Sequence, residues 1–367
     1  MTQTLDIAVL PGDGIGREVM PACLAILSAA EALTGGPALR CTAWPAGALH
    51  YRDHGEALPA ATLAACGQAD AILFGAMGWP DIRYPDGTEP IPQLDLRMAF
   101  DLYAGVRPIR WFPGLPRVLA DPRAEQVDFV LVREQTEGLF YARGRGRMVD
   151  DAEAYDTMQI TRKGTARVSE FAFALAKRRR ARRGKATVTC VDKSNVFASM
   201  AFFRKVFDDV ARVHPSVAAD YAYVDAMALN MVKKPWALDV LVTENMFGDI
   251  LSDLGAGLVG GMGMAPSADI GDAHGLFQPA HGTAPDIAGQ GKANPSAMIL
   301  SAAMMLDWLA DRHSEPSLER RARLLERALE AALGAGTVPM EIGGGAGLDE
   351  MTRATLAALP GAMGDRP

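Results

Sequence analysis

The apolar residues of this chain fall into short runs that alternate with helical or loop stretches. The opening "DIAVLPGDGIGREVMPACLAILSAA" begins with a buried-type strand, turns at a glycine cluster and continues as a helix with apolar periodicity. This alternation predicts an α/β protein with a mainly parallel sheet and helices on its faces. The later apolar runs lie at residues 70–77, 127–134, 186–193 and 239–245.

Charged or amide side chains follow three of these runs. They are Arg133 with Glu134, Asp192 with Lys193, and Glu244 with Asn245. In open α/β sheets ligands bind beyond the carboxyl ends of the strands. We therefore expect these strand ends to face one site.

The stretch "NMFGDILSD" at 245–253 places Asp249 and Asp253 four residues apart, among leucines at helical spacing. On a helix both carboxylates leave the same face, roughly 6 Å apart. Two negative charges so close repel each other unless a cation lies between them. Favourable contact with the dipole of the helix N-terminus would explain Asp249 but not Asp253 one turn later. The spacing therefore predicts a cation site.

The glycine turn after the first strand invites comparison with a nucleotide-binding loop. Gly12, Gly14 and Gly16 alternate, however, and position 17 is Arg, so the strict G-x-G-x-x-G pattern is absent. We expect this turn to have a structural role.

Composition narrows the class of protein. The chain has 367 residues, enough for two domains, and 49% hydrophobic residues, which is ordinary for a globular protein. It contains no long apolar stretch, and "MTQTLDIAVL" lacks the features of a signal peptide, so we expect a cytoplasmic protein without a membrane partner. The net charge of −7 argues against nucleic acid as the main partner. Four scattered cysteines, Cys23, Cys41, Cys66 and Cys190, are expected to be reduced thiols.

Two biased segments are expected to lie on the surface. The basic run "KRRRARRGK" at 177–185 follows an amphipathic pattern, and basic residues near a helix C-terminus complement its dipole. RNA binding by this run is the alternative. The Ala/Arg-rich segment near 316–333 is expected to form an exposed terminal helix.

Three arginines stand out as candidate substrate ligands: Arg97 in "LDLRMAF", Arg107 in "GVRPI" and Arg133 in "LVREQTEG". Each alone is more typical of a surface residue or an ion pair. Together with a lysine at a strand end and a carboxylate cluster they indicate a polyanionic substrate, because guanidinium groups bind carboxylates in a bidentate manner.

Taken with "VDKSN", "YVDAMA", "TENMFGDILSD" and "HGTAPDIAGQGKANPSAMILSAAMML", this pattern resembles the metal-dependent β-decarboxylating dehydrogenases. That family includes 3-isopropylmalate, isocitrate, homoisocitrate and tartrate dehydrogenases, and the resemblance runs from residue 7 to about 310. It implies a two-domain α/β fold that is not a standard Rossmann fold. The large cofactor-binding domain would comprise 1–102 plus 260–367, and the small dimerisation domain 103–259.

The resemblance implies a metal site and a set of catalytic residues. Asp249 and Asp253 of one chain, with Asp225 of a second copy, would bind Mg²⁺ or Mn²⁺, which prefer oxygen ligands. Lys193 matches the general base, which works through a hydroxyl or water and needs a pKa below its usual ~10.4. In the family a tyrosine seven residues after the "VRE" arginine protonates the enolate. Here that position is Phe140.

Tyr141 follows directly after Phe140 and is predicted to be the proton donor, with water as the alternative. A loop that carries one extra residue would let Tyr141 reach the enolate carbon.

The resemblance also implies NAD as cofactor. Asp286, followed by Ile287, stands where NAD users place an aspartate that accepts from the ribose hydroxyls, so NAD is expected rather than NADP. Asn195 is expected to face the nicotinamide. The residues expected to hold the adenosine half are His281, Gly282, Ala284, Asp286 and Asn294.

Because the family takes its lysine and one aspartate from a second subunit, a homodimer with shared active sites is implied. The segment 144–161 corresponds to the arm that pairs across the two-fold axis.

The substrate is less closely defined. In "EPIPQLDLR", Leu94 matches one leucine of the isopropylmalate enzymes, Gln93 stands where a second leucine or an asparagine would be, and Ile91 replaces a serine of the isocitrate enzymes. Gln278 replaces a glutamate near the nicotinamide. We expect 3-isopropylmalate, with isocitrate, tartrate or another substituted malate open. A catalytically silent metabolite- or RNA-binding homologue is the alternative from another class.

Overall fold

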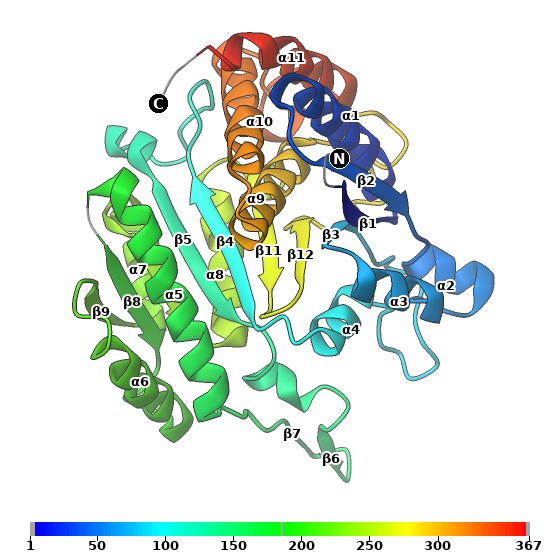
Figure 1. The fold of residues 1–367 in the computed structure, drawn as a ribbon. Coiled ribbons are helices and arrows are strands. Elements are labelled where there is room, and N and C mark those ends of the chain that lie inside the picture. The colour runs from blue at the N-terminus through cyan, green and yellow to red at the C-terminus, as the bar shows by residue number, and fades with distance from the viewer. Residues whose placement is uncertain (1–3, 185, 365–367) are drawn as a thin grey trace.

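One large sheet forms the centre of the molecule. The computed structural model describes residues 4–184 and 186–364, without the side chains of 182 and 183. The strands of the large sheet are β1 (Thr4–Gly12), β2 (Ala38–Ala43), β3 (Ala71–Ala76), β4 (Ala104–Arg110), β5 (Asp128–Glu134), β8 (Thr187–Asp192), β9 (Ala218–Tyr223), β10 (Val240–Thr243), β11 (Pro266–Ile270) and β12 (Gly275–Pro279). Their order is β2-β1-β3-β12-β11-β4-β5-β10-β8-β9 (Figure 1).

The sheet is parallel towards both edges and antiparallel in the middle. β2, β1, β3 and β12 pair in parallel, as do β5, β10, β8 and β9. Between these halves β11 is antiparallel to β12 and β4, and β4 is antiparallel to β5. The expected α/β class with mainly parallel pairing is confirmed, and each predicted apolar run forms a strand.

The expected domain boundaries coincide with the middle of this sheet. Segments 1–102 and 260–367 contribute β1, β2, β3, β12 and β11, whereas 103–259 contributes β4, β5, β10, β8 and β9. The two sets meet where β11 pairs with β4. Because hydrogen bonds continue across this junction, the division into two domains stays a prediction.

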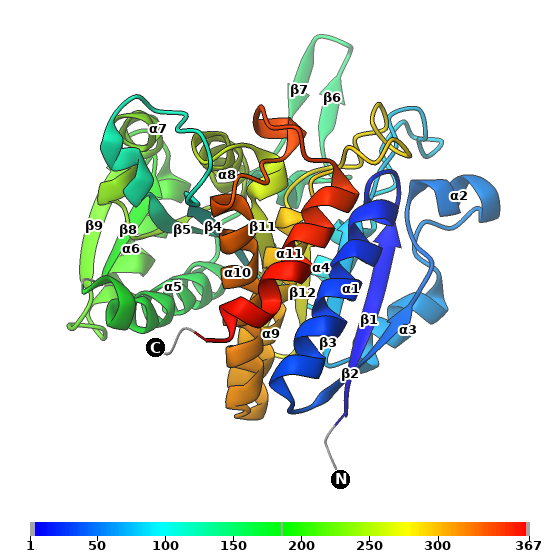
Figure 2. The same cartoon turned by 90° about the horizontal axis from the view of Figure 1, so that it is seen from above.

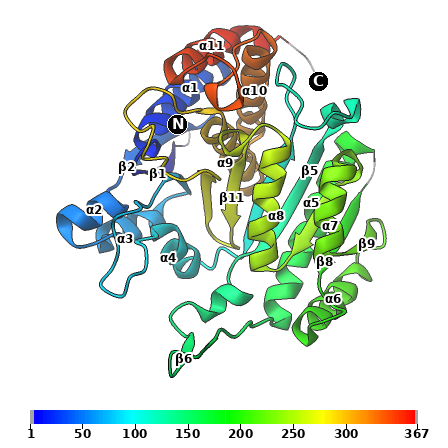
Figure 3. The same cartoon turned by 180° about the vertical axis from the view of Figure 1, so that it is seen from behind.

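Helices cover both faces of the sheet. Figure 2 shows α1, α9, α10 and α11 gathered into one group of helices, with α1 beside β1, and comparison of Figures 1 and 3 shows α5 and α8 on opposite sides of β5. The helices are α1 (Gly16–Thr34), α2 (Ala48–His54), α3 (Ala60–Gln68), α4 (Pro92–Ala99), α5 (Arg162–Arg183), α6 (Ala198–Ala211), α7 (Val224–Lys233), α8 (Asn245–Leu258), α9 (Ser296–His313), α10 (Pro316–Gly334) and α11 (Leu348–Ala362).

Strand β5 shows why the strands are almost continuously apolar. Val130 and Val132 pack into the cluster that contains Phe173 of α5, while Phe129 and Leu131 pack into the cluster that contains Leu251 of α8. Successive side chains point to opposite faces of a strand, and here both faces are covered. Alternate residues of β5 are therefore buried on the face covered by α5, and the residues between them are buried on the face covered by α8.

The glycine turn after β1 packs against a loop from the far end of the chain. Gly12 and Gly14 have φ values of 77° and 49°, which favour glycine. A Cβ at Gly14 would lie 2.2 Å from the carbonyl oxygen of Thr283, and Ile15 donates its N–H to the same oxygen at 2.9 Å. The turn thus supports the segment that follows β12.

A hairpin, β6 (Arg147–Val149) and β7 (Glu153–Tyr155), extends away from the body of the molecule (Figures 1 and 2). It lies within the predicted dimerisation arm at 144–161. Met148 and Tyr155 are exposed on it.

The expectation of an exposed terminal helix at 316–333 is wrong. One face of α10 is buried, with Leu318 and Leu325 in the core, and α11 follows it. Arg321 is fully buried, and its guanidinium donates to the carbonyl oxygens of Gly35 (2.7 Å) and Pro37 (3.1 Å) beyond α1. The many Ala and Arg residues obscured an apolar stripe at helical spacing.

The described part of the basic run 177–185 contacts other elements. Arg179 pairs with Asp128 and Asp239 at 2.9 and 3.2 Å, and Lys177 contacts His214 at 2.8 Å. The side chains of 182 and 183, and Lys185, lie outside the described residues. No helix in the described part of the chain is both long and apolar enough to cross a membrane.

Replacing Arg321 should destabilise the fold without touching the pocket. Arg321→Ala leaves the buried carbonyl of Pro37 without its donor and removes the ion pair with Glu31, and we expect the free energy of unfolding to fall by about 3 kcal/mol in urea denaturation. Arg320→Ala, one residue earlier and exposed, is the control and should change it by less than about 0.5 kcal/mol. Equal small effects would contradict a stabilising role for Arg321.

Candidate active site

A pocket lies between the two parallel halves of the sheet. Its space is about 830 Å³, part of it open to solvent. Residues of β3, α4, β4, β5, α8 and β12 line it, so both halves contribute. Of the strand ends that were expected to face one site, β5 contributes Arg133 to the lining, whereas Lys193 after β8 and Asn245 after β10 are not among the lining residues.

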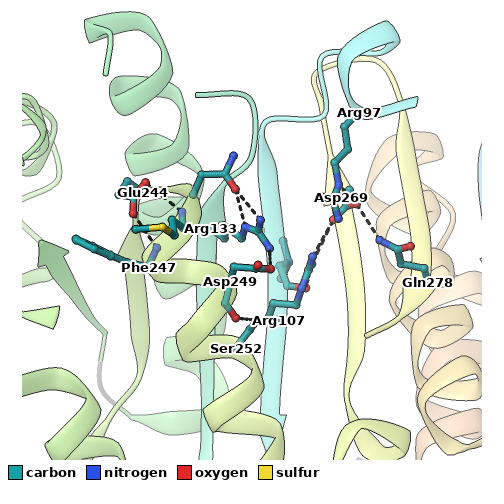
Figure 4. A network of polar contacts seen from close by, with 12 residues as sticks. Arg97, Arg107, Arg133, Glu244, Phe247, Asp249, Ser252, Asp269 and Gln278 are labelled. Atoms are coloured by element: carbon teal, nitrogen blue, oxygen red, sulfur yellow. Dashed lines mark hydrogen bonds and ion pairs between the residues drawn. The ribbon is translucent and has the colours of Figure 1, made fainter. Parts of the chain in front are cut away.

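The three candidate arginines converge on this pocket. Arg97 comes from α4, Arg107 from β4 and Arg133 from β5, and they are only 7%, 7% and 3% exposed. Figure 4 shows Arg97 and Arg107 reaching towards Asp269, and Arg133 towards Asp249. Three buried guanidinium groups in one cavity are arranged to bind an anion with more than one carboxylate.

Helix α8 places its carboxylates on the wall of the pocket. The helix begins after Glu244, whose side chain accepts the N–H groups of Met246 (3.1 Å) and Phe247 (2.7 Å). Asp249 and Asp253 both line the pocket, as their spacing predicts. Burial and the nearby charge of Asp249 raise the pKa of Asp253. Repulsion between the two carboxylates acts in the same direction as burial.

Arg133 connects β5 with α8. Its Nε and Nη2 donate to Asn245 Oδ1 at 2.9 and 2.6 Å, and its Nη1 donates to Asp249. Gly248 makes this close approach possible, because a Cβ there would lie 2.6 Å from the Arg133 side chain. Burial, together with repulsion from Arg97, lowers the pKa of Arg133 to about 10, so the group stays charged at neutral pH.

Asp269 is a functional candidate that the sequence did not reveal. It is fully buried on β11, where it accepts from Arg97 Nε at 2.7 Å and Arg107 Nη1 at 3.2 Å. Gln278 Nε2 donates to it at 3.0 Å. Burial alone would raise the pKa of Asp269, but Arg97 and Arg107 outweigh it and hold the pKa below its ordinary value. The only signal in the sequence is a lone aspartate inside an apolar strand.

One wall of the pocket is mostly apolar. Ile91, Gln93, Leu94 and Phe140 line it, and the guanidinium carbon of Arg133 lies 5.1 Å from the centre of the Phe140 ring. Gln93 and Leu94 thus line the pocket, and their contact with substrate stays a prediction.

Tyr141 is not among the residues that line the pocket. It lies in the 3-10 helix η2 (Leu139–Ala142), and its ring centre is 4.0 Å from the guanidinium carbon of Arg145. Phe140, from the same turn, occupies the wall instead.

The segment after β12 brings the expected cofactor residues beside the pocket. His281 and Gly282 line it, and burial lowers the pKa of His281. His281 Nε2 is buried and has no hydrogen-bond partner within residues 4–184 and 186–364. Such an orphaned nitrogen fits a segment that binds a ligand.

The other expected cofactor residues lie further along this segment, outside the pocket lining. Asn294 is held by Glu341, to which its Nδ2 donates at 3.3 Å, and it accepts the N–H of Ser296 at 3.1 Å. The remaining expected cofactor residues outside the pocket lining are Ala284, Asp286 and Ile287.

Lys193 and Asp225 lie outside this pocket and contact each other instead. Lys193 Nζ donates to Asp225 Oδ1 at 2.6 Å, which holds the pKa of Asp225 below its ordinary value. Asn195, in the turn after β8, is exposed and also outside the pocket. Among the described residues no cluster of three or more His, Cys, Asp or Glu side chains could hold a metal ion. The pair Asp249 and Asp253 fits a hard cation only if further oxygen ligands come from substrate, water or another chain.

Comparison with known proteins agrees with this geometry. The family model described as isocitrate/isopropylmalate dehydrogenase matches residues 6–355. A 3-isopropylmalate/3-methylmalate dehydrogenase of Methanocaldococcus jannaschii is 41% identical over 346 residues, which cover 94% of this chain and 96% of that protein. A 3-isopropylmalate dehydrogenase of Anaeromyxobacter dehalogenans is 42% identical over 345 residues, covering 92% and 94%.

Solved structures show the same similarity. The crystal structure of isocitrate dehydrogenase from Methylococcus capsulatus has a TM-score of 0.83 and 35% identity, covering 97% of this chain and 99% of that chain. The TT0538 protein from Thermus thermophilus has a TM-score of 0.86 and 35% identity, covering 100% and 70%. The chain therefore belongs to the isocitrate/isopropylmalate dehydrogenase family.

Proposed function

We propose that this decarboxylating dehydrogenase oxidises and decarboxylates a substituted malate, with 3-isopropylmalate as the first candidate, using NAD and Mg²⁺ or Mn²⁺. The observation that carries the proposal is the pocket in which Arg97, Arg107 and Arg133 meet the carboxylate pair of α8. Relatives at about 40% identity named 3-isopropylmalate dehydrogenase support this substrate. Isocitrate and tartrate are the alternatives.

The roles of the arginines follow from their placement. Their guanidinium groups would bind the two carboxylates of a malate and hold its C2 hydroxyl towards α8. Gln93 and Leu94, with Ile91 and Phe140, would contact the C3 substituent, and three of these four side chains are apolar. An alkyl group suits this wall better than a charged one.

Asp249 and Asp253, with Asp225 of a second copy, would hold the divalent cation. When bound, the cation supplies Lewis-acid polarisation of the C2 oxygen and stabilises the charge that develops on it. The aspartates fix its position on α8, beside the arginines that orient the substrate.

Lys193 of a second copy would accept the hydroxyl proton, through a water or hydroxyl. Its amino group is the only candidate base that the resemblance assigns to this step. In this chain Lys193 and Asp225 are already paired, so they would enter the other copy's pocket together.

The segment that contains His281, Gly282, Ala284, Asp286, Ile287 and Asn294, with Asn195 from a second copy, would bind NAD. When bound, the nicotinamide accepts the C2 hydride. Asp286 would accept from the ribose hydroxyls and repel the additional phosphate of NADP.

A homodimer with shared sites would complete this constellation. The neighbouring helices α7 and α8 expose Leu229 (56%), Val232 (46%) and Ile250 (61%), a set of apolar side chains that a second copy would cover. Residues 103–259, which hold both helices and the arm at 144–161, would form the dimerisation domain, and 1–102 with 260–367 the cofactor domain. A cytoplasmic location is part of this proposal.

The direct test is a substrate panel. Reduction of NAD and of NADP is followed by absorbance with 3-isopropylmalate, 3-methylmalate, isocitrate and tartrate, with and without Mn²⁺. We expect metal-dependent reduction of NAD, fastest with the alkyl-substituted malates. No reduction with any of them would favour a silent binding homologue over an enzyme.

Removing one charge from α8 should weaken metal binding. Asp253→Asn keeps the shape of the side chain, and we expect Mn²⁺ affinity to fall at least about tenfold by calorimetry, because a charged oxygen ligand is lost. The melting temperature of the metal-free protein should stay the same or rise, since repulsion with Asp249 is relieved. Asp349→Asn, in the first turn of α11, is the control. Unchanged Mn²⁺ affinity would contradict the assignment.

Mixed dimers test whether sites are shared. Asp253→Asn and Lys193→Ala should each be inactive alone. In heterodimers of the two, one site collects both substitutions and the other is intact, so co-expression in equal amounts should restore about a quarter of wild-type activity. If each chain carried a complete site, mixing would restore nothing.

Tyr141 is the proposed donor of the final proton, although η2 must turn for its hydroxyl to reach the pocket. Tyr141→Phe should then lower kcat about 10²-fold with little effect on substrate binding, measured where chemistry limits turnover. Near-normal turnover would assign the proton to water, in keeping with the position of Phe140 in the wall.

A further inference from the structure

The charges around the arginine pocket sum to zero before anything binds. Arg97, Arg107 and Arg133 supply three positive charges. The α8 pair, Asp249 and Asp253, supplies two negative charges, and the buried Asp269 supplies a third. A divalent cation would bring the sum to +2. A paired lysine and aspartate from a second copy would not change it.

A net charge of +2 matches a substrate with two carboxylates. A malate with an uncharged C3 substituent is a dianion at neutral pH, and one with a carboxylate on that substituent is a trianion. The extra charge of the trianion would face Ile91, Leu94 and Phe140, which offer it no hydrogen bond, and Gln93, whose uncharged amide can donate but cannot neutralise it. Buried charge without compensation is strongly unfavourable.

Asp269 is the group that sets this balance. The α8 carboxylates line the pocket and would hold the proposed cation, whereas Asp269 is fully buried, is not among the lining residues and accepts from Arg97 and Arg107. Without its charge the site with a cation would carry +3, and two guanidinium groups would gain free hydrogen-bonding capacity. Such a site would suit a tricarboxylate.

We propose that Asp269 is a specificity-determining residue, which restricts the pocket to dicarboxylates with an uncharged substituent by neutralising one of the three arginine charges. The inference rests on the proposed function for its choice of substrates. It concerns which anion the pocket accepts, and so it can be measured by binding alone.

Gln278 provides a matched variant. It lies on the adjacent strand β12, lines the pocket and donates to Asp269 at 3.0 Å. Gln278→Glu adds one negative charge at nearly the same place where Asp269→Asn removes one. The double variant, with Asp269→Asn and Gln278→Glu, restores the original net charge of the pocket.

The probes are isopropylsuccinate and tricarballylate, a dicarboxylate and a tricarboxylate that lack the C2 hydroxyl and cannot be oxidised. Their dissociation constants are measured by calorimetry with Mn²⁺ for the full-length protein. We expect the wild type to prefer isopropylsuccinate. Asp269→Asn should shift the preference towards tricarballylate by about tenfold or more, because one buried unit charge has changed. The double variant with Gln278→Glu should return the preference towards the wild-type value.

An unchanged preference in Asp269→Asn, or a wild type that favours tricarballylate, would overturn the inference, as would absence of binding of both probes to the wild type. If the melting curve shows that Asp269→Asn does not fold, the single variant Gln278→Glu provides the test. We then expect Gln278→Glu to shift the preference further towards isopropylsuccinate, and an unchanged preference would overturn the inference. Failure of every malate to be oxidised would count against the proposed function and leave this binding comparison intact.

Discussion

The contact of two buried guanidinium groups with the Asp269 carboxylate is the constraint on which the rest of the site depends. Arg97 and Arg107 are drawn from different elements into an apolar interior, where isolated positive charges would be prohibitively unfavourable. Asp269 makes their burial possible and fixes their orientation. Arg133, which Asn245 holds in place, completes the wall together with Asp249 and Asp253 of α8.

Local features of the sequence explain how this arrangement is built. Glu244 starts α8 by accepting backbone N–H groups, and Gly248 lets that helix lie against the Arg133 side chain. The glycine turn after β1 holds the segment that carries His281 by packing on Thr283. The residues proposed to bind ligand thus rest on residues that only position the backbone.

Part of the fold and part of the candidate site could be predicted because they depend on local patterns in the sequence. Apolar runs identified β1, β3, β5, β8 and β10, though not the other strands of the large sheet, and the four-residue spacing of Asp249 and Asp253 identified one face of a helix. Asp269 was not identified because its partners Arg97 and Arg107 lie 172 and 162 residues away in the sequence, and no local pattern connects them to it. The burial of α10 was missed for a similar reason, since its arginines suggested solvent while one of them is enclosed by the end of α1. Which ring of the Phe140–Tyr141 pair faces the pocket depends on how a single short turn packs, and spacing along the chain does not determine that.

The antiparallel junction of β11 with β4 has a consequence for the energetics of ligand binding. Residues on either side of this junction line the same pocket, with Arg97 and Gln278 on one side and Arg107 and Arg133 on the other. A ligand that contacts both sides is coupled to the pairing of these strands, and its binding free energy adds to their resistance to separation. Opening of the junction and release of the ligand therefore form one linked equilibrium, so amide hydrogens of β4 and β11 act as natural reporters of occupancy.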